Sequence, residues 1–165
     1  MEAKLAPVII NGVVLEPKSE LHRKKLEALR AFVEKLLHSQ AKEAIVKVIL
    51  FGSALDGDVW EESDVDVLVF GKHPLKAVEE ACLAAAFETM LAMSESVEPL
   101  VRTANDYFTP ESYFVYTTIK KGREIYSMDE ETLRRKEVKH CTPWLPNTWA
   151  KPRGDMIPAT KARDG

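Results

Sequence analysis

The hydrophobic and polar positions of this chain follow two periods, and together they predict an α/β fold. Residues 8–15 read Val-Ile-Ile-Asn-Gly-Val-Val-Leu, and Asn-Gly between β-branched runs is a strong signal for a tight β-hairpin. From Glu20 to about His38, apolar residues recur at helical spacing, which predicts an amphipathic helix with a charged outer face. Ser19 is its expected N-cap. We expect His22 and His38 to lie on the charged face of this helix and assign them no functional role.

The rest of the pattern predicts a small sheet with further helices. Two apolar, β-branched runs at 45–51 and 65–70 predict buried strands joined by an acidic loop. An Ala- and Leu-rich stretch predicts a helix from Pro74 to about Met93. A third strand is expected at 96–103, where Pro99 restricts it to a sheet edge or a bulge. The last expected elements are a helix at about 109–122, a strand at 124–126 and a helix at 129–140.

The length of the chain and the loss of periodicity after residue 140 predict one domain followed by a tail. A chain of 165 residues has room for a single hydrophobic core. We expect the domain to cover residues 1–140, with the hairpin at 8–15 included. Residues 141–165 contain several prolines together with Trp144 and Trp149 but no periodicity, which is typical of a C-terminal tail.

Composition and charge narrow the classes of function. A net charge of −3 and a pI near 5.9 give no general reason to expect nucleic-acid binding. No apolar run is long enough to predict a membrane span or a secretion signal. Cys82 and Cys141 suggest no disulfide framework, which suits the cytoplasm. The charge is uneven, however: acidic residues gather in the loop and strand start at 56–66.

This acidic segment contains the residues with the clearest chemistry. Gly52-Ser53 is followed by ten residues and then by Asp64-Val65-Asp66. Carboxylates two residues apart in a strand project from the same face, and hard oxygen ligands suit Mg²⁺ bound to a triphosphate. Gly52 allows a ligand to approach the backbone, while Ser53 adds a hydroxyl and an N–H donor. The pattern therefore predicts a metal and phosphate site.

The same residues resemble a known family. Gly-Ser, ten residues and Asp-x-Asp are similar to the signature of the DNA polymerase β-like nucleotidyltransferase superfamily, especially its minimal nucleotidyltransferase branch. The resemblance implies a nucleotidyltransferase fold of the α/β (α+β) type, with a small mixed sheet and helices mainly on one face. It also implies two Mg²⁺ ions held by Asp64, Asp66 and a third carboxylate. Glu98 occupies the matching place, with Glu95 and Asp106 as alternatives.

Further residues are expected around the nucleotide. Gly52, Ser53, Ser63 and Arg102 form the expected nucleotide-binding set, although Ser63 equally fits a structural role in closing the loop. Asp56 stands where minimal members commonly carry a basic residue. We therefore expect ATP binding to depend steeply on Mg²⁺. Positive charge would have to come from elsewhere, and the candidates are Lys47, Lys72, Lys120, Lys121 and Arg123.

The resemblance implies transfer of AMP from ATP to an acceptor. Stand-alone minimal members are often antitoxins that adenylylate a helical ribonuclease of the HEPN type, so a protein acceptor is the leading hypothesis. Two alternatives stay open. One is a non-catalytic protein that keeps the fold and binds a nucleotide or a partner. The other is a small-molecule nucleotidyltransferase with an acceptor pocket near Tyr107 and Tyr113.

Overall fold

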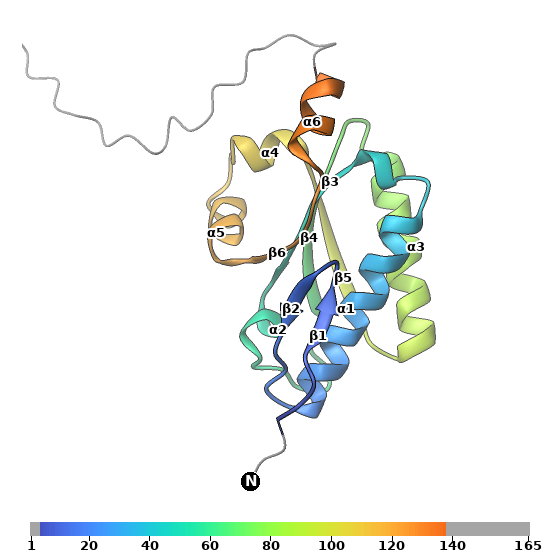
Figure 1. Cartoon of the computed structure of the whole chain (residues 1–165), viewed down its shortest axis with the longest axis vertical. Coiled ribbons are helices and arrows are strands. Elements are labelled where there is room, and N and C mark those ends of the chain that lie inside the picture. Colours follow the sequence, from blue (N-terminus) through green and yellow to red (C-terminus); the bar gives the residue numbers. More distant parts are fainter. Residues whose placement is uncertain (1–3, 138–165) are drawn as a thin grey trace, which may run out of the picture.

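The computed structural model describes residues 4–137, with side chains described to Leu133, and shows a four-stranded sheet between two sets of helices (Figure 1). The strands are β1 (Val8–Ile10), β2 (Val13–Leu15), β3 (Ile45–Phe51), β4 (Val65–Gly71), β5 (Val97–Thr103) and β6 (Arg123–Ser127). The helices are α1 (Glu20–His38), η1 (Lys42–Ala44), α2 (Ser53–Asp56), α3 (Lys76–Met93), α4 (Ala104–Phe108), α5 (Tyr113–Lys121) and α6 (Glu130–Glu137).

The sheet is mixed, as predicted, with strand order β5-β4-β3-β6. Strand β3 pairs antiparallel with both β4 and β6, whereas β4 and β5 are parallel and are connected by α3. Strand β5 forms one edge of the sheet. Pro99 therefore lies where a residue without an N–H donor is tolerated, in agreement with the sequence.

Alternating side chains of the strands divide the core into two layers. Val65, Val67 and Val69 of β4 pack in a cluster with α1, α3 and the hairpin β1–β2. Leu68 and Phe70 point the other way, into a smaller cluster with residues of α5 and α6. The two long helices thus cover one face, as predicted, and the short helices α4, α5 and α6 lie at the other (Figure 1).

The N-terminal hairpin is tied into this core. Val8 and Ile10 are 3% and 1% exposed, and Asn11 donates a side-chain hydrogen bond to the carbonyl oxygen of Ile125 in β6 (3.3 Å). Asn11 and Gly12 both have positive φ angles, as the predicted tight turn requires. The hairpin therefore packs as part of the same body as the sheet.

Helix ends show where the sequence signals succeeded and failed. Ser19 caps α1, because its hydroxyl accepts a hydrogen bond from the N–H of His22 (3.0 Å). Helix α5 begins at Tyr113 and is capped by Ser112, later than the expected start near 109. Helix α3 begins at Lys76, two residues after Pro74. The expected tail, with Trp144, Trp149 and Cys141, lies outside the described residues.

Within residues 4–137, no helix has both the length and the apolar character that a membrane span requires.

Candidate functional site

Gly52 links β3 to the short helix α2 in a conformation that only glycine adopts readily. Its φ and ψ angles are +74° and −157°, a region of backbone space that is essentially restricted to glycine. A Cβ atom at this position would overlap the carboxylate oxygen Oδ2 of Asp66 and lie 3.2 Å from its Cγ. Glycine is therefore required twice, by the turn and by the close approach of the Asp66 carboxylate.

Asp66 and Glu98 are brought together by the parallel pairing of β4 and β5. They are register partners in neighbouring strands. Val65, Val67 and Val97 belong to the core under α1 and α3, so the alternation of the strands directs Asp66 and Glu98 to the opposite face. The structure thus brings together two acids that the resemblance to the family had singled out.

The electrostatics of Asp66 reflect a cluster of like charges. Its pKa is raised above the ordinary value of 3.8, first by burial, then by the charge of Glu98, and least by that of Asp64. Asp64 immediately precedes β4 and is exposed. Mutual repulsion among carboxylates is relieved when a cation lies between them. The three acids thus form a negatively charged site next to the Gly52 turn.

The two alternatives to Glu98 lie elsewhere. Glu95 forms an ion pair with the Nζ atom of Lys25 at 2.5 Å. Asp106 lines a separate pocket together with Arg102, Glu111, Ser112 and Val115. Glu98 is therefore the acid that shares a register position with Asp66.

Ser63 directly precedes Asp64 and is held within its loop, whereas Arg102 lies further along β5 than Glu98. Ser63 is 5% exposed, and its hydroxyl accepts a hydrogen bond from the N–H of Trp60 (2.9 Å), so it closes the loop before Asp64. Arg102 is four residues beyond Glu98 on β5, opposite Phe70 rather than Asp66. Its place in the Asp106 pocket puts it toward the other end of the strand.

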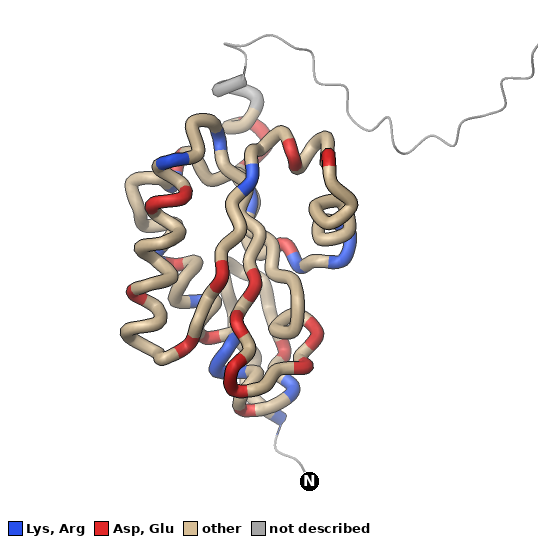
Figure 2. Tube along the Cα trace, turned by 180° about the vertical axis from the view of Figure 1, so that it is seen from behind, with Lys and Arg blue, Asp and Glu red and all other residues tan. Residues whose placement is uncertain are grey.

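Two of the basic candidates are likewise directed away from the acids. Lys47 contacts Glu124 (2.7 Å) and Ser127 (2.9 Å) and lies over the Tyr107 ring, near the start of β3. Arg123 pairs with Leu50 in the sheet and lines a cavity near α2. Figure 2 shows acidic positions gathered on neighbouring strands and loops at the lower end of the molecule. The site is therefore electronegative.

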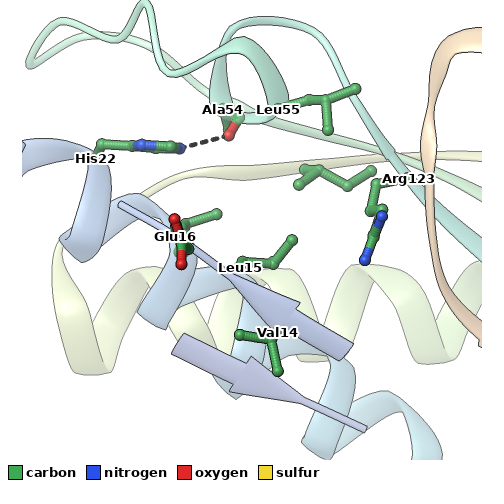
Figure 3. A pocket seen from close by; sticks show the side chains of 9 residues that line it. Val14, Leu15, Glu16, His22, Ala54, Leu55 and Arg123 are labelled. Atoms are coloured by element: carbon green, nitrogen blue, oxygen red, sulfur yellow. Dashed lines mark hydrogen bonds between the residues drawn. The ribbon is translucent and has the colours of Figure 1, made fainter. Parts of the chain in front are cut away.

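That cavity, of about 210 Å³, lies between the hairpin, α1 and α2 (Figure 3). Its lining includes Leu26 and Leu50, which belong to the core under α1 and α3. It therefore opens on the face of the sheet opposite to the carboxylates, and Figure 3 shows Arg123 projecting into it. The sequence did not indicate this cavity.

Two buried polar residues of α1 hold the loops around the site, and the sequence interpretation missed both. His22 was expected on the charged face but is 3% exposed. Its Nε2 atom lies 2.7 Å from the carbonyl oxygen of Ala54 in α2 (Figure 3), while its Nδ1 accepts from the N–H of Lys18. Lys25 is 1% exposed. Both residues follow the helical spacing of Leu26, Leu29 and other buried residues of α1. This spacing was the signal in the sequence that could have predicted their burial.

The donor set suits a hard divalent cation, although the acids are not closed around one. Within residues 4–137, no group of three His, Cys, Asp or Glu side chains is already arranged as a metal site. Glu98 and Asp64 nevertheless add to the burial that raises the pKa of Asp66, and oxygen ligands of this kind are those that Mg²⁺ prefers. Asp64, Asp66 and Glu98 therefore fit an open Mg²⁺ site whose remaining ligands come from phosphate and water.

The chain is also similar to known proteins. A sequence model of the family "Polymerase beta, Nucleotidyltransferase" matches residues 34–131, which is more than half of the chain. A relative from Methanocaldococcus jannaschii, "Putative protein adenylyltransferase MJ0604", is 35% identical over 72 residues, which cover 44% of this chain and 71% of the relative. A solved structure, "Crystal structure of the toxin-antitoxin with AMP-PNP", shares 17% identity over 72% of this chain and 84% of that chain, with a TM-score of 0.39.

Proposed function

Because this chain belongs to the polymerase β nucleotidyltransferase family, we propose that it transfers AMP from ATP to a protein acceptor in a Mg²⁺-dependent reaction. The observation that carries the proposal is the approach of the Asp66 carboxylate to the Gly52 turn, with Glu98 beside it in the next strand. This arrangement joins a backbone suited to phosphate with carboxylates suited to the cation that accompanies phosphate.

Each residue of the site has a role in this proposal. Asp64, Asp66 and Glu98 would hold Mg²⁺, which supplies charge neutralisation at the triphosphate and a lower pKa for the attacking hydroxyl. Gly52 and Ser53 would contact the β- and γ-phosphates. The acceptor oxygen forms a bond to the α-phosphorus, the bond to pyrophosphate breaks, and the hydroxyl proton passes to Glu98 or water. A cation beside Asp66 would favour its ionised form and so oppose the burial and like charges that raise its pKa.

The acceptor is the finer part of the proposal. The relative from Methanocaldococcus jannaschii bears the name of a protein adenylyltransferase, which supports a protein acceptor here. Stand-alone members of the minimal branch, which this chain resembles, suggest a helical HEPN-type ribonuclease as that acceptor. We propose the hydroxyl of a tyrosine in such a partner as the group that receives AMP.

Calorimetric titration of ATP tests the site. We expect binding in Mg²⁺, none in EDTA, and none for the Asp64→Ala/Asp66→Ala variant under either condition. Glu79→Ala/Glu80→Ala removes the same charge from the exposed surface of α3 and should bind like the wild type. Binding that persists in EDTA or in the site variant would contradict the proposal. ATP labelled at the α-phosphate, incubated with a HEPN-type ribonuclease, then tests whether label is transferred to protein.

A further inference from the structure

The strongest unexplained feature of the molecule is a fully buried ammonium group on α1. Lys25 is among the largest of the side chains that are less than 2% exposed. A charged group is rarely buried so deeply unless its hydrogen bonds are satisfied. Lys25 also precedes residues 34–131, which the family model matches, so the family assignment gives it no role.

All three donors of the Lys25 ammonium are used. Nζ donates to the carbonyl oxygens of Glu61 (2.9 Å) and Ser63 (2.6 Å) and forms an ion pair with Oε2 of Glu95 (2.5 Å). The Lys25 and Glu95 side chains are 2% and 13% exposed, so solvent screens the pair only slightly. An ammonium has three N–H donors, and the geometry therefore fixes the position of Lys25 completely.

These partners come from the two segments that lead into the carboxylate strands. Ser63 directly precedes Asp64 and β4, while Glu95 lies three residues before Glu98 in β5. The N–H of Val65 donates to the carbonyl oxygen of Ser96 (2.9 Å), so the same segments are also joined to each other. Lys25 thus bridges the entry to β4 and the entry to β5 with one side chain.

We propose that Lys25 is a positioning residue that sets the separation of Asp64 and Asp66 from Glu98, and thereby the affinity of the site for Mg²⁺ with ATP. This inference rests on the proposed function. Lys25 acts through the loop backbone and through Glu95, since its side chain projects into the α1 side of the sheet and the acids face the other side. Groups that orient metal ligands in this way typically change metal affinity about 10- to 100-fold when they are removed.

The test compares Lys25→Met with Lys35→Met. Each variant removes an ammonium of α1 that forms an ion pair with a glutamate: Lys25 pairs with Glu95, in the loop after α3, and Lys35 pairs with Glu88 of α3. The Lys35–Glu88 pair (3.2 Å) is exposed and involves neither strand entry. We expect Lys25→Met to need about tenfold more Mg²⁺ for half-maximal ATP binding. Lys35→Met should stay within about twofold of the wild type because exposed ion pairs contribute little. Equal Mg²⁺ requirements for all three proteins would overturn the inference.

A second variant separates positioning from stability alone. Lys25→Met leaves the Glu95 carboxylate buried without its partner, so a lower midpoint of urea unfolding is expected. Lys25→Met/Glu95→Gln removes both charges and should recover part of that midpoint, but its Mg²⁺ requirement should stay high because the carbonyls of Glu61 and Ser63 remain unheld. If the Mg²⁺ requirement of this double variant returned to the wild-type value together with the urea midpoint, Lys25 would have only a structural role.

Amide hydrogen exchange distinguishes failure of this inference from failure of the proposed function. Loss of the bridge should speed exchange of the Ser63 and Val65 amides, which donate to Trp60 and Ser96, in Lys25→Met but not in Lys35→Met. Wild-type protein that binds no ATP in Mg²⁺ would refute the proposed function, even with this exchange difference present. Wild-type binding with unchanged exchange and unchanged Mg²⁺ requirement in Lys25→Met would refute the bridge alone.

Discussion

At the scale of single residues, Gly52 shows how one missing side chain makes room for a charged group. Its backbone conformation and the nearby Asp66 carboxylate both exclude a Cβ atom. Gly12 offers a matched comparison, since its φ is also positive (+79°) but nothing lies within 4 Å of a Cβ placed there. The two glycines therefore separate backbone strain from a clash at the site.

We expect Gly12→Ala to lower the free energy of unfolding by about 1 kcal/mol, the cost of a left-handed conformation for a residue with a Cβ. Gly52→Ala should cost about 2–3 kcal/mol, because its conformation is less accessible, and should abolish Mg²⁺-dependent ATP binding by displacing Asp66. Urea unfolding and calorimetric titration measure the two effects. A Gly52→Ala protein that binds ATP like Gly12→Ala would show that Asp66 tolerates displacement.

Some residues of the site follow from local sequence and others do not. Gly52, Asp64 and Asp66 were found because a turn followed by a strand fixes their relative placement within fifteen positions of the chain. The position of Glu98 beside Asp66 depends on the register between β4 and β5, which are separated in the sequence by the whole of α3. Lys25 and His22 looked like ordinary polar surface, because burial of a polar side chain is decided by loops 30 or more residues away. Their positions on the apolar stripe of α1 were the only local feature of the sequence that indicated their burial.

At the scale of elements, α1 is an organising helix with two kinds of buried contact. Its apolar residues form the core with the sheet and α3. At its N-terminal end, His22 holds α2 and Lys25 holds the loop before β4. Lys18, just before the helix, adds a side-chain hydrogen bond to the carbonyl oxygen of Asp56. One helix therefore positions both loops that border the carboxylates.

Helix α3 contrasts with α1, because large apolar side chains lie on its exposed face as well. Leu83, Phe87 and Leu91 are 67%, 57% and 68% exposed. Phe32 of α1, in comparison, is fully buried. These exposed side chains remain in contact with water and should contribute little to the stability of the folded chain.

We therefore expect Phe32→Ala to lower the free energy of unfolding by about 3–5 kcal/mol, through lost burial and a cavity. Phe87→Ala should change it by no more than about 0.5 kcal/mol. Denaturant unfolding of both variants at low protein concentration measures the difference. A large decrease in the free energy of unfolding of Phe87→Ala would mean that the exposed face of α3 packs against another surface in solution.

The long elements could be predicted from the period of their apolar positions, whereas the shortest helices could not. Helix α1 and strands β3 and β4 have enough residues for the period of their apolar positions to be read directly. The helices η1, α2 and α4 have three, four and five residues, which is too short for a period. They form because tertiary contacts, such as the bond from His22 to Ala54, hold one turn in place.

At the scale of the whole molecule, the acidic site should make stability depend on pH. The pKa of Asp66 is raised in the folded protein by burial, by Glu98 and by Asp64, while in the unfolded chain it is near 3.8. Above that value the folded state keeps a proton that the unfolded state has lost. The contribution of Asp66 to stability therefore falls as pH rises through the window above 3.8, until the folded carboxyl is ionised too.

The Asp66→Asn variant removes this titration. We expect its free energy of unfolding to exceed that of the wild type by a margin that grows from pH 4 upward and then levels off, without Mg²⁺. Urea unfolding of both proteins from pH 4 to pH 7 measures this margin. Carboxylates that titrate in the same way in the wild type and in the variant cancel in the difference. A margin that shrinks with rising pH would contradict the assigned direction of the pKa shift.

The parallel pairing of β4 and β5 also determines when the site comes into existence. The two strands become neighbours only after α3 has crossed the sheet, and non-local pairings of this kind form late in folding because loop closure must precede them. Asp66 meets Glu98 at that step. A nascent or partly folded chain therefore holds the two halves of the site apart, and the proposed nucleotide binding would require that β4 and β5 have already paired.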